Sequence, residues 1–467
     1  MSKMKCNRRE AIRTMAAGAA AGGMLPLARS RGAQTRPNIV FVLIDDQRYD
    51  AMGFMGKPWL KTPNMDRLAR EGVQFENSFV TTSLCSPSRA SFLTGRYAHC
   101  HGVMNNATPW LDSNLTFLEI LHAQGYRTGF IGKWHMPGEG VPDLANQGKV
   151  DRMVSFSFGT GQGRYNDCPL IIDGQKTKKK GYITDVLTDY ALEFLKDLDR
   201  YSYDEDDEGI SRPFCLYLSH KAVHAFFNPP KRYEGVLKDA PLPRLEPQTR
   251  DLPLGLINAQ QRSRFDKNVQ GYYEALMAVD DSLGSVLDYL DAKGLSENTL
   301  VIYTSDNGYF WGEHGLTDKR YAYDEALLIP HLIRYPRLIP EGGKKVSEMV
   351  LNIDLAPTVL SAAGIEPPPV MQGRSWLDLA QGRTMPWRDS FLYEYFRDPA
   401  FPNPRIKAVR TREWKYITYP DSKYPDEMYN LIEDPREKND LAFDPAYADK
   451  KNELIGELKR LEKETSC

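Results

Sequence analysis

Two pairs of oxygen-bearing side chains directly follow apolar runs that have the composition of buried strands. The first pair is Asp45 and Asp46, and the second is Asp306 and Asn307. A lone aspartate pair is commonly a helix cap or a turn, but two such sets brought together would need a cation to neutralise their carboxylates. Three carboxylates and one amide suit calcium or magnesium better than zinc. The sequence therefore predicts a site for a hard cation.

A second candidate for chemistry is the segment that begins at Cys85. Ser86 is predicted as the N-cap of a short helix with Pro87 at its first position, and Gly95 is predicted to end it. Cys85 then lies at the positive end of the helix dipole, which favours anions. Arg89 returns to the same face one turn later and can offer a bidentate fork to a tetrahedral oxyanion. This segment is thus predicted to bind an anion.

The spacing around Cys85 argues against catalysis by the thiol itself. A cysteine-dependent phosphatase would need an arginine six positions after the cysteine, where this chain has Ser91. The other cysteines are irregularly spaced and form no CxxC pair, so the sequence indicates neither a zinc knuckle nor a disulfide framework. Cys215 lies inside an apolar run and is predicted to be a small buried side chain. The remaining cysteines are Cys6, Cys100, Cys168 and Cys467.

The elements that must position these groups follow an α/β pattern. Strand-like runs at 38–44, 126–132, 213–219 and 300–304 alternate with amphipathic helical stretches. This order predicts a mainly parallel sheet flanked by helices. Ligands of such sheets bind outside the carboxyl ends of the strands. Beyond the acidic pairs, the side chains delivered to that edge are Lys133, His135, His220 and His224.

The last quarter of the chain is predicted to form a smaller unit. A Pro-rich stretch at 365–374 is typical of a boundary, and short strands are predicted within 389–418. An amphipathic helix is predicted at 447–465. We therefore expect a large catalytic domain at 34–375. The C-terminal α+β subdomain, with short antiparallel strands and a closing helix, is expected at 376–467.

Composition and charge narrow the class of protein. The 467 residues include 60 basic and 62 acidic side chains, and 41% are hydrophobic, which excludes collagen-like, fully disordered and polytopic membrane proteins. This balance also argues against a nucleic-acid binder. Residues 1–33 carry the pair Arg8-Arg9 before an Ala- and Gly-rich stretch, and they resemble a bacterial twin-arginine export signal; a disordered basic tail is the alternative. We expect the export machinery as a partner, a periplasmic, cell-surface or secreted location, and no integral membrane segment after signal removal.

The motif Cys85-Ser-Pro-Ser-Arg89, followed by Leu93-Thr-Gly-Arg96, resembles the signature of the formylglycine-dependent sulfatases of the alkaline phosphatase superfamily. The resemblance extends from Arg36 to Asn439. It implies an alkaline phosphatase-like fold with a large mixed sheet, and conversion of Cys85 to 3-oxoalanine (formylglycine) by a separate maturation enzyme that acts on the unfolded chain. It also implies one calcium ion per chain. The implied ligands are Asp45, Asp46, Asp306 and Asn307, together with Cys85 after its conversion.

The same resemblance implies a role for each remaining group. One hydroxyl of the aldehyde hydrate attacks sulfur, and Asp306 is a candidate acceptor for its proton. Arg89, Lys133 and Lys319 are expected to hold the sulfate oxygens, with Arg320 as the alternative to Lys319. His224 is expected to protonate the leaving alcohol, and His220 is the alternative. His135 then takes the proton of the second hydroxyl, so that sulfate leaves and the aldehyde is regenerated.

Several stretches indicate a substrate class. Residues 97–106, 161–165 and 181–185 look most like the branch that removes 6-sulfate from N-acetylglucosamine in mucin-type or glycosaminoglycan chains. Arylsulfatase activity on small synthetic esters is expected as a side activity. A phosphomonoesterase or phosphodiesterase of the same superfamily is one alternative, because phosphate and sulfate esters are both tetrahedral and anionic. An exported glycan-binding protein without catalysis is another.

Overall fold

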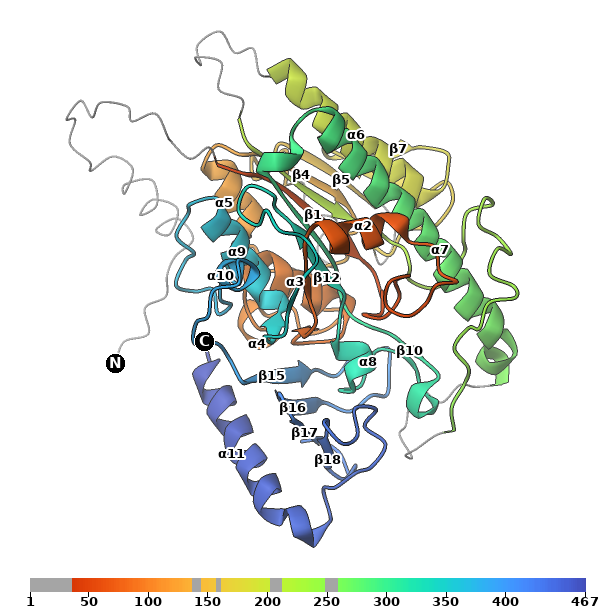
Figure 1. Cartoon of the computed structure of the whole chain (residues 1–467), viewed down its shortest axis with the longest axis vertical. Coiled ribbons are helices and arrows are strands. Elements are labelled where there is room, and N and C mark those ends of the chain that lie inside the picture. The colour runs from red at the N-terminus through yellow and green to blue at the C-terminus, as the bar shows by residue number, and fades with distance from the viewer. Residues whose placement is uncertain (1–35, 137–143, 157–160, 202–211, 248–258) are drawn as a thin grey trace, which may run out of the picture.

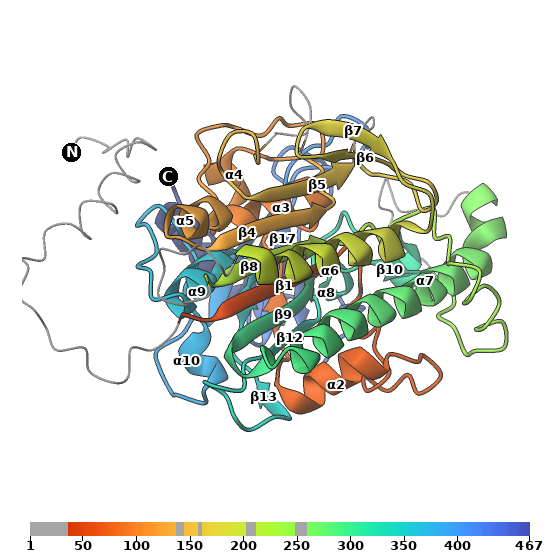
Figure 2. The ribbon, with the colours of Figure 1, turned by 90° about the horizontal axis from the view of Figure 1, so that it is seen from above.

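The computed structural model describes residues 36–136, 144–156, 161–201, 212–247 and 259–467. Its centre is a ten-stranded sheet that crosses the molecule (Figure 1, Figure 2). In spatial order the strands are β13 (Lys344–Val346), β2 (Val73–Phe75), β12 (His331–Arg334), β9 (Thr299–Ser305), β1 (Asn38–Ile44), β8 (Phe214–Ser219), β4 (Arg127–Gly132), β5 (Arg152–Phe156), β6 (Pro169–Ile172) and β7 (Gln175–Lys178).

The middle of this sheet is parallel. Strand β1 pairs in parallel with both β8 and β9, and β4 pairs in parallel with β8 and β5. Strands β12, β6 and β7 run antiparallel to their inner neighbours, so the sheet is mixed. The four predicted strand-like runs all lie in the parallel centre. Their carboxyl ends therefore share one edge, as the sequence predicted.

Helices cover both faces of the sheet because its central strands are apolar on both sides (Figure 2). Val40, Val42 and Ile44 of β1 pack into one core, and Ile39, Phe41 and Leu43 into the other. The first core lies under α2 (Pro63–Glu71), α6 (Ile183–Tyr201) and α7 (Ala259–Ala292), and the second under α3 (Cys85–Thr94), α5 (Phe117–Ala123) and α9 (Leu355–Ala362).

A second sheet of four antiparallel strands lies beside the large one (Figure 1). Its strands are β15 (Ser390–Tyr395), β16 (Ile406–Thr411), β17 (Trp414–Thr418) and β18 (Glu427–Asn430), and α11 (Ala448–Glu464) packs on them. The predicted fold class is confirmed: a large mixed sheet flanked by helices and a smaller C-terminal subdomain. The boundary at residue 376 stays a prediction, because one hydrophobic core joins the small sheet to residues of the large domain such as Phe79 and Phe310.

Short elements complete the described chain. They are β3 (Ser78–Phe79), α4 (Ala98–His101), η1 (Ser296–Asn298), β10 (Phe310–Trp311), η2 (Glu313–Gly315), β11 (Thr317–Asp318), α8 (Asp324–Leu327), β14 (Val350–Leu351), η3 (Asn352–Asp354), α10 (Leu377–Ala380) and η4 (Pro445–Tyr447).

Two cysteines correct the sequence analysis. Cys100 of α4 and the C-terminal residue Cys467 form a disulfide across 367 positions of sequence. The cysteine spacing indicated no disulfide framework and did not reveal this single pair, because partners so far apart leave no spacing signal. Cys215 is fully buried in β8, as predicted. The predicted export signal at 1–33 lies outside the described residues, and no helix in the described part of the chain is long and apolar enough to cross a membrane.

Candidate active site

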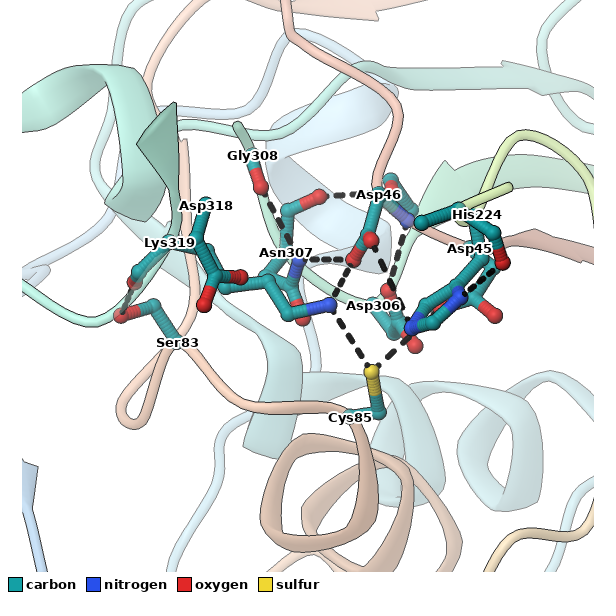
Figure 3. A network of polar contacts seen from close by, with 12 residues as sticks. Asp45, Asp46, Ser83, Cys85, His224, Asp306, Asn307, Gly308, Asp318 and Lys319 are labelled. Atoms are coloured by element: carbon teal, nitrogen blue, oxygen red, sulfur yellow. Dashed lines mark hydrogen bonds and ion pairs between the residues drawn. The ribbon is translucent and has the colours of Figure 1, made fainter. Parts of the chain in front are cut away.

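The predicted cation ligands meet at the carboxyl edge of the large sheet. Asp45 and Asp46 follow β1, and Asp306 follows the adjacent parallel strand β9. The backbone N–H of Asp46 donates to Oδ1 of Asp306 at 3.0 Å, which locks the two strand ends together. One carboxylate oxygen from each aspartate and Sγ of Cys85 all lie within 4.8 Å of one another (Figure 3). All four side chains are buried.

Asn307 completes this group and supplies a test of whether a cation fits. Its Nδ2 donates to Oδ1 of Asp46 at 2.7 Å and to the carbonyl of Gly308 at 2.9 Å. Its Oδ1 is buried and has no hydrogen-bond partner. A buried amide oxygen without a donor beside three carboxylates is an arrangement that a hard cation would satisfy. The donor set therefore fits the predicted metal.

Cys85 is the first residue of α3 and faces the carboxylates. Its Sγ lies 3.4 Å from Oδ1 of Asp45, and Nζ of Lys319 donates to it at 3.1 Å. Burial raises the pKa of the thiol, and the neighbouring lysines only partly oppose this. The side chain is therefore held as a neutral thiol and is a poor nucleophile as it stands. This agrees with the spacing argument against thiol catalysis.

The start of α3 differs from the prediction in one detail. The N-cap is Leu84, which has no capping side chain, and the helix begins at Cys85 itself. Ser86 is not the cap because its Oγ donates instead to the carbonyl of His135 at 2.5 Å. Gly95 ends the helix in the left-handed conformation, with φ of 66°, as predicted.

Two lysines enter the cluster of carboxylates. Lys133 forms an ion pair with Asp45, and Lys319 forms one with Asp46. Burial raises the pKa of Asp45, but the nearby cations, led by Lys133, outweigh it and hold the pKa well below its usual range. Burial also raises the pKa of Asp306, to about 7, and the charge of Asp45 adds to this effect. The structure therefore brings Lys133 and Lys319 to the predicted place.

Arg320, the alternative to Lys319, points elsewhere. Its guanidinium contacts Asp318, Tyr395 and Asp398, and the last two belong to the C-terminal subdomain. Lys319 alone of this pair reaches Cys85 and Asp46. The geometry thus separates the two candidates, which sequence reasoning left open.

Arg89 lies at the site but is bound to protein groups. Its Nε donates to Oδ2 of Asp306 at 2.8 Å, and its Nη1 donates to Oγ of Ser219 at 2.6 Å and to the carbonyl of Lys133 at 2.9 Å. The sequence predicted that this fork would hold an oxyanion directly. In the structure it orients Asp306 and the end of β4, so its contacts favour a positioning role.

The two candidate general acids occupy different places. His224 Nδ1 lies 2.8 Å from the carbonyl of Ala225, which can only accept, so this nitrogen carries the proton. Its Nε2 faces the cluster, 3.9 Å from Oδ2 of Asp46 (Figure 3). His220 instead contacts Oγ of Ser282 in α7 at 3.1 Å and is completely buried. Burial lowers the pKa of both imidazoles, that of His220 to about 4.

His135 lies on the side of the site formed by the end of β4. Its Nδ1 is 3.4 Å from Oγ of Ser86, and its backbone has a positive φ of 60°. Burial lowers its pKa well below the usual range, and the charge of Lys133 adds to this effect. The ring is thus held in the neutral form, which can accept a proton.

Sequence reasoning missed two side chains at this edge. Lys221 is buried, its Nζ donates to the carbonyl of Ala225 at 3.3 Å, and burial lowers its pKa to about 8. Tyr272 of α7 donates from its hydroxyl to the carbonyl of Asp46 at 2.9 Å. Lys221 could have been found from its position between His220 and His224. Tyr272 has no local signal, because only the packing of α7 brings it there.

Comparisons with known proteins agree with this geometry. The sulfatase family model matches residues 37–365, and a model described as the C-terminal region of N-sulphoglucosamine sulphohydrolase matches residues 312–464. An N-acetylglucosamine-6-O-sulfatase of Bacteroides thetaiotaomicron is 31% identical, over 92% of this chain and 87% of that protein.

Solved structures extend the comparison to the fold. A protein solved in complex with its substrate D-glucosamine-2-N,6-O-disulfate superimposes with a TM-score of 0.82 and 30% identity, over 92% of this chain and 98% of the other. A phosphonate monoester hydrolase of Agrobacterium radiobacter has a TM-score of 0.70 at 22% identity, over 92% and 96% of the two chains, and shows the shared fold alone. With the family model covering most of its length, this chain belongs to the sulfatase family and is a hydrolase of sulfuric esters.

Proposed function

We propose that this sulfatase removes 6-sulfate from N-acetylglucosamine residues of sulfated glycans. The observation that carries the proposal is the placement of Cys85, at the start of α3, among three buried carboxylates, two lysines and His224. The names of similar proteins support the choice of sugar and sulfate position. Arylsulfatase activity on small synthetic esters is expected from the same centre.

Conversion of Cys85 to formylglycine is part of this proposal. The neutral, fully buried thiol cannot supply the nucleophile, whereas the hydrate of an aldehyde would supply a hydroxyl group at the same position. Because no part of Cys85 is exposed in the folded chain, a maturation enzyme must reach it before folding. Export through the twin-arginine route, which we also propose, would then have to follow maturation.

The second part of the proposal is a calcium ion held by Asp45, Asp46, Asp306 and Asn307. Oxygen donors without a nitrogen ligand are the set that this cation prefers. When bound, the ion would lower the pKa of the attacking hydroxyl and stabilise negative charge on the sulfate oxygens. The orphaned Oδ1 of Asn307 and the carboxylates crowded around it support the assignment.

Each of the other side chains would have its own role in ester cleavage. The ammonium groups of Lys133 and Lys319 would hold the sulfate oxygens and offset the charge that develops there. Nε2 of His224 would donate the proton that the leaving alcohol takes up. Because Nδ1 keeps its own proton on the carbonyl of Ala225, this step needs the doubly protonated ring, which the negative charge of a bound sulfate ester would favour. His135, held neutral by burial, would accept a proton as sulfate leaves. Arg89 would keep Asp306 and the end of β4 in place.

Two measurements on protein from a host with the maturation system test the proposal. Mass spectrometry of the peptide that contains residue 85 should show the aldehyde form in place of the thiol. Sulfate release should be faster from 6-sulfated N-acetylglucosamine than from its 3- or 4-sulfated isomers. An unmodified thiol, together with faster turnover of phosphate esters, would contradict the proposal and favour a phosphoesterase. Faster release from another isomer would overturn only the sulfate position.

A further inference from the structure

A cavity of about 860 Å³ lies between the start of α6, the middle of α7 and the segment 227–235. One segment of chain contributes to its lining and also carries His224 of the candidate active site. Phe227, three residues after His224, forms part of its lining, and the adjacent Asn228 does so too. A path along one short segment therefore leads from the expected proton donor to the cavity.

Two tyrosines hold the segment from His224 to Asn228 in place. The hydroxyl of Tyr165 donates to the carbonyl of His224 at 2.6 Å, and that of Tyr182 donates to the carbonyl of Asn228 at 3.0 Å. Their rings stack with centroids 5.7 Å apart. On the opposite side Gly271 lets α7 approach closely, since a Cβ there would lie 2.2 Å from the carbonyl oxygen of Phe227. The cavity is thus formed before any ligand binds.

The chemistry of the lining is that of a polyhydroxylated, uncharged ligand. Amide groups and carboxylates in the lining offer donors and acceptors to hydroxyl groups, and two largely buried aromatic rings form part of its wall. The members of these three classes are Asn166, Asn228 and Gln270; Asp185, Glu234 and Glu274; and Tyr182 and Phe227.

The charged side chains that line this cavity balance one another. Its three cationic side chains are Lys231, Arg232 and Lys267, and they equal its three carboxylates in number. Arg232 is already held by a bidentate pair with Asp185, with both N–O distances at 2.8 Å. A second sulfate or a uronic acid would therefore find no excess of positive charge here.

We propose that this cavity binds an uncharged sugar residue adjoining the sulfated one, so that the enzyme acts on a neutral hexose or N-acetylhexosamine backbone. The proposal rests on the proposed function for the position of the sulfated sugar. Phe226, whose side chain is 83% exposed, lies between His224 and the lining residue Phe227 in the sequence and would offer an aromatic face to the connecting sugar.

Three substrates and one pair of variants test the subsite. We expect kcat/KM to be about tenfold higher for a galactose–N-acetylglucosamine-6-sulfate disaccharide than for the monosaccharide sulfate or for a hexuronate-bearing disaccharide. Asn166→Trp, at an exposed lining position, should fill the cavity and remove this advantage, measured as the ratio of disaccharide to monosaccharide turnover by the same variant. Asn166→Ser is the matched control, because it leaves the cavity open and keeps a hydroxyl group that can donate and accept at the same place. Equal rates for the two disaccharides would overturn the assignment to a neutral sugar.

A charge-reversal pair sharpens the same test. Glu234→Lys gives the cavity an excess of positive charge and should raise relative turnover of the hexuronate-bearing disaccharide a few-fold. Glu453→Lys, on exposed α11, makes the same change in net charge far from the cavity and should leave the ratio unchanged. If both variants shift the ratio equally, overall charge and not the cavity controls it, and the proposal fails.

A binding measurement separates failure of this inference from failure of the proposed function. Calorimetry with the unsulfated galactose–N-acetylglucosamine disaccharide reports on the cavity without any sulfate release. Binding that Asn166→Trp abolishes and Asn166→Ser preserves supports the subsite even if 6-sulfate is the wrong position. An absence of binding to the wild-type protein, alongside active sulfate release, would contradict the subsite alone.

Discussion

Two clusters of buried charged side chains in this molecule have a similar composition but different roles. The catalytic cluster joins Asp45, Asp46 and Asp306 to Lys133, Lys319 and Arg89 at the end of the large sheet. The docking cluster, which we define as Asp324, Arg410, Lys415 and Glu437, joins α8 to the C-terminal subdomain. Both exclude water almost completely.

The two clusters differ in what their buried polar atoms bind. In the docking cluster, Asp324 accepts from Arg410 at 3.0 Å and from Lys415 at 2.6 Å, and its backbone N–H donates to Glu437 at 2.7 Å. These bonds connect one part of the fold to another. In the catalytic cluster, Oδ1 of Asn307 has no donor, and the side chains converge on Cys85. A convergent set with an unmet oxygen indicates a ligand, whereas buried charge alone does not.

The largest effect is expected at the centre of the catalytic cluster. Cys85→Ala should lower sulfate release by a factor on the order of 10⁴ or more, because no nucleophile can form at that position. The measurement is initial rate per folded molecule on an aryl sulfate. Cys215→Ala is the matched control, since it removes an equally buried thiol in β8 that faces no charged group of the site. Full turnover by Cys85→Ala would contradict the mechanism.

A substitution in the docking cluster should lower the stability of the protein and leave its turnover unchanged. Asp324→Asn removes the counter-charge of buried Arg410 and leaves Lys415 paired with Glu437 alone, and we expect a loss of about 3–5 kcal/mol in the free energy of unfolding. Urea titration measures it. Activity per folded molecule should stay unchanged. Asp389→Asn, which breaks an exposed pair with Arg412, should cost less than about 1 kcal/mol.

A comparable cost for Asp389→Asn would show that the docking cluster is no more important than a surface pair. A large drop in turnover per folded molecule for Asp324→Asn would show that the two clusters are coupled. Either result would end the distinction between them.

The leaving group should reveal which histidine donates a proton. His224→Gln should lower kcat/KM by about 100-fold on a sugar sulfate and much less on an aryl sulfate, whose leaving group needs little protonation. His122→Gln, at a partly exposed histidine paired with Asp151, is the control and should change neither rate. An equal loss on both esters would contradict the assignment. The same dependence in His220→Gln would reassign the role to His220.

The strands and their ends could be predicted because their signal is local. The run 38–44 is continuously apolar and forms β1 with the predicted bounds, and the run 300–304 lies within β9. Once parallel pairing is inferred, the meeting of Asp45 with Asp306 follows from topology. The same reasoning placed Lys133 and His224 at the edge.

Contacts between distant segments could not be predicted in this way. The sequence allowed Arg89 to bind an oxyanion, and only the packed structure shows that Asp306 occupies its fork. The disulfide of Cys100 and Cys467 and the contact of Tyr272 with Asp46 depend on where whole elements pack. Local patterns therefore predicted which groups reach the site, but not which of them are already bound to each other.

The smallest effect is expected at the contact that holds the end of the chain, where charge is only partly buried. His99 Nδ1 lies 2.5 Å from Oε2 of Glu394, and its Nε2 lies 2.9 Å from the carbonyl of Thr465. Burial lowers the pKa of His99. The hydrogen bond and charge of Glu394, together with the hydrogen bond to the carbonyl of Thr465, outweigh burial and raise the pKa above its usual value. The protonated ring can donate to both acceptors at once, which the neutral ring cannot.

Because the folded pKa is raised, the stabilisation from His99 is fully present below the unfolded pKa of about 6.5 and is lost as pH rises through the folded value. Wild type and His99→Gln should therefore differ most at acidic pH, by less than about 1 kcal/mol since solvent reaches part of the ring, and should converge at alkaline pH. Urea titration across this range, with the disulfide intact in both proteins, measures the difference. A difference that grows with pH would show that the ring is neutral in the folded chain and that, unlike the lysines of the catalytic cluster, it carries no charge into its contact.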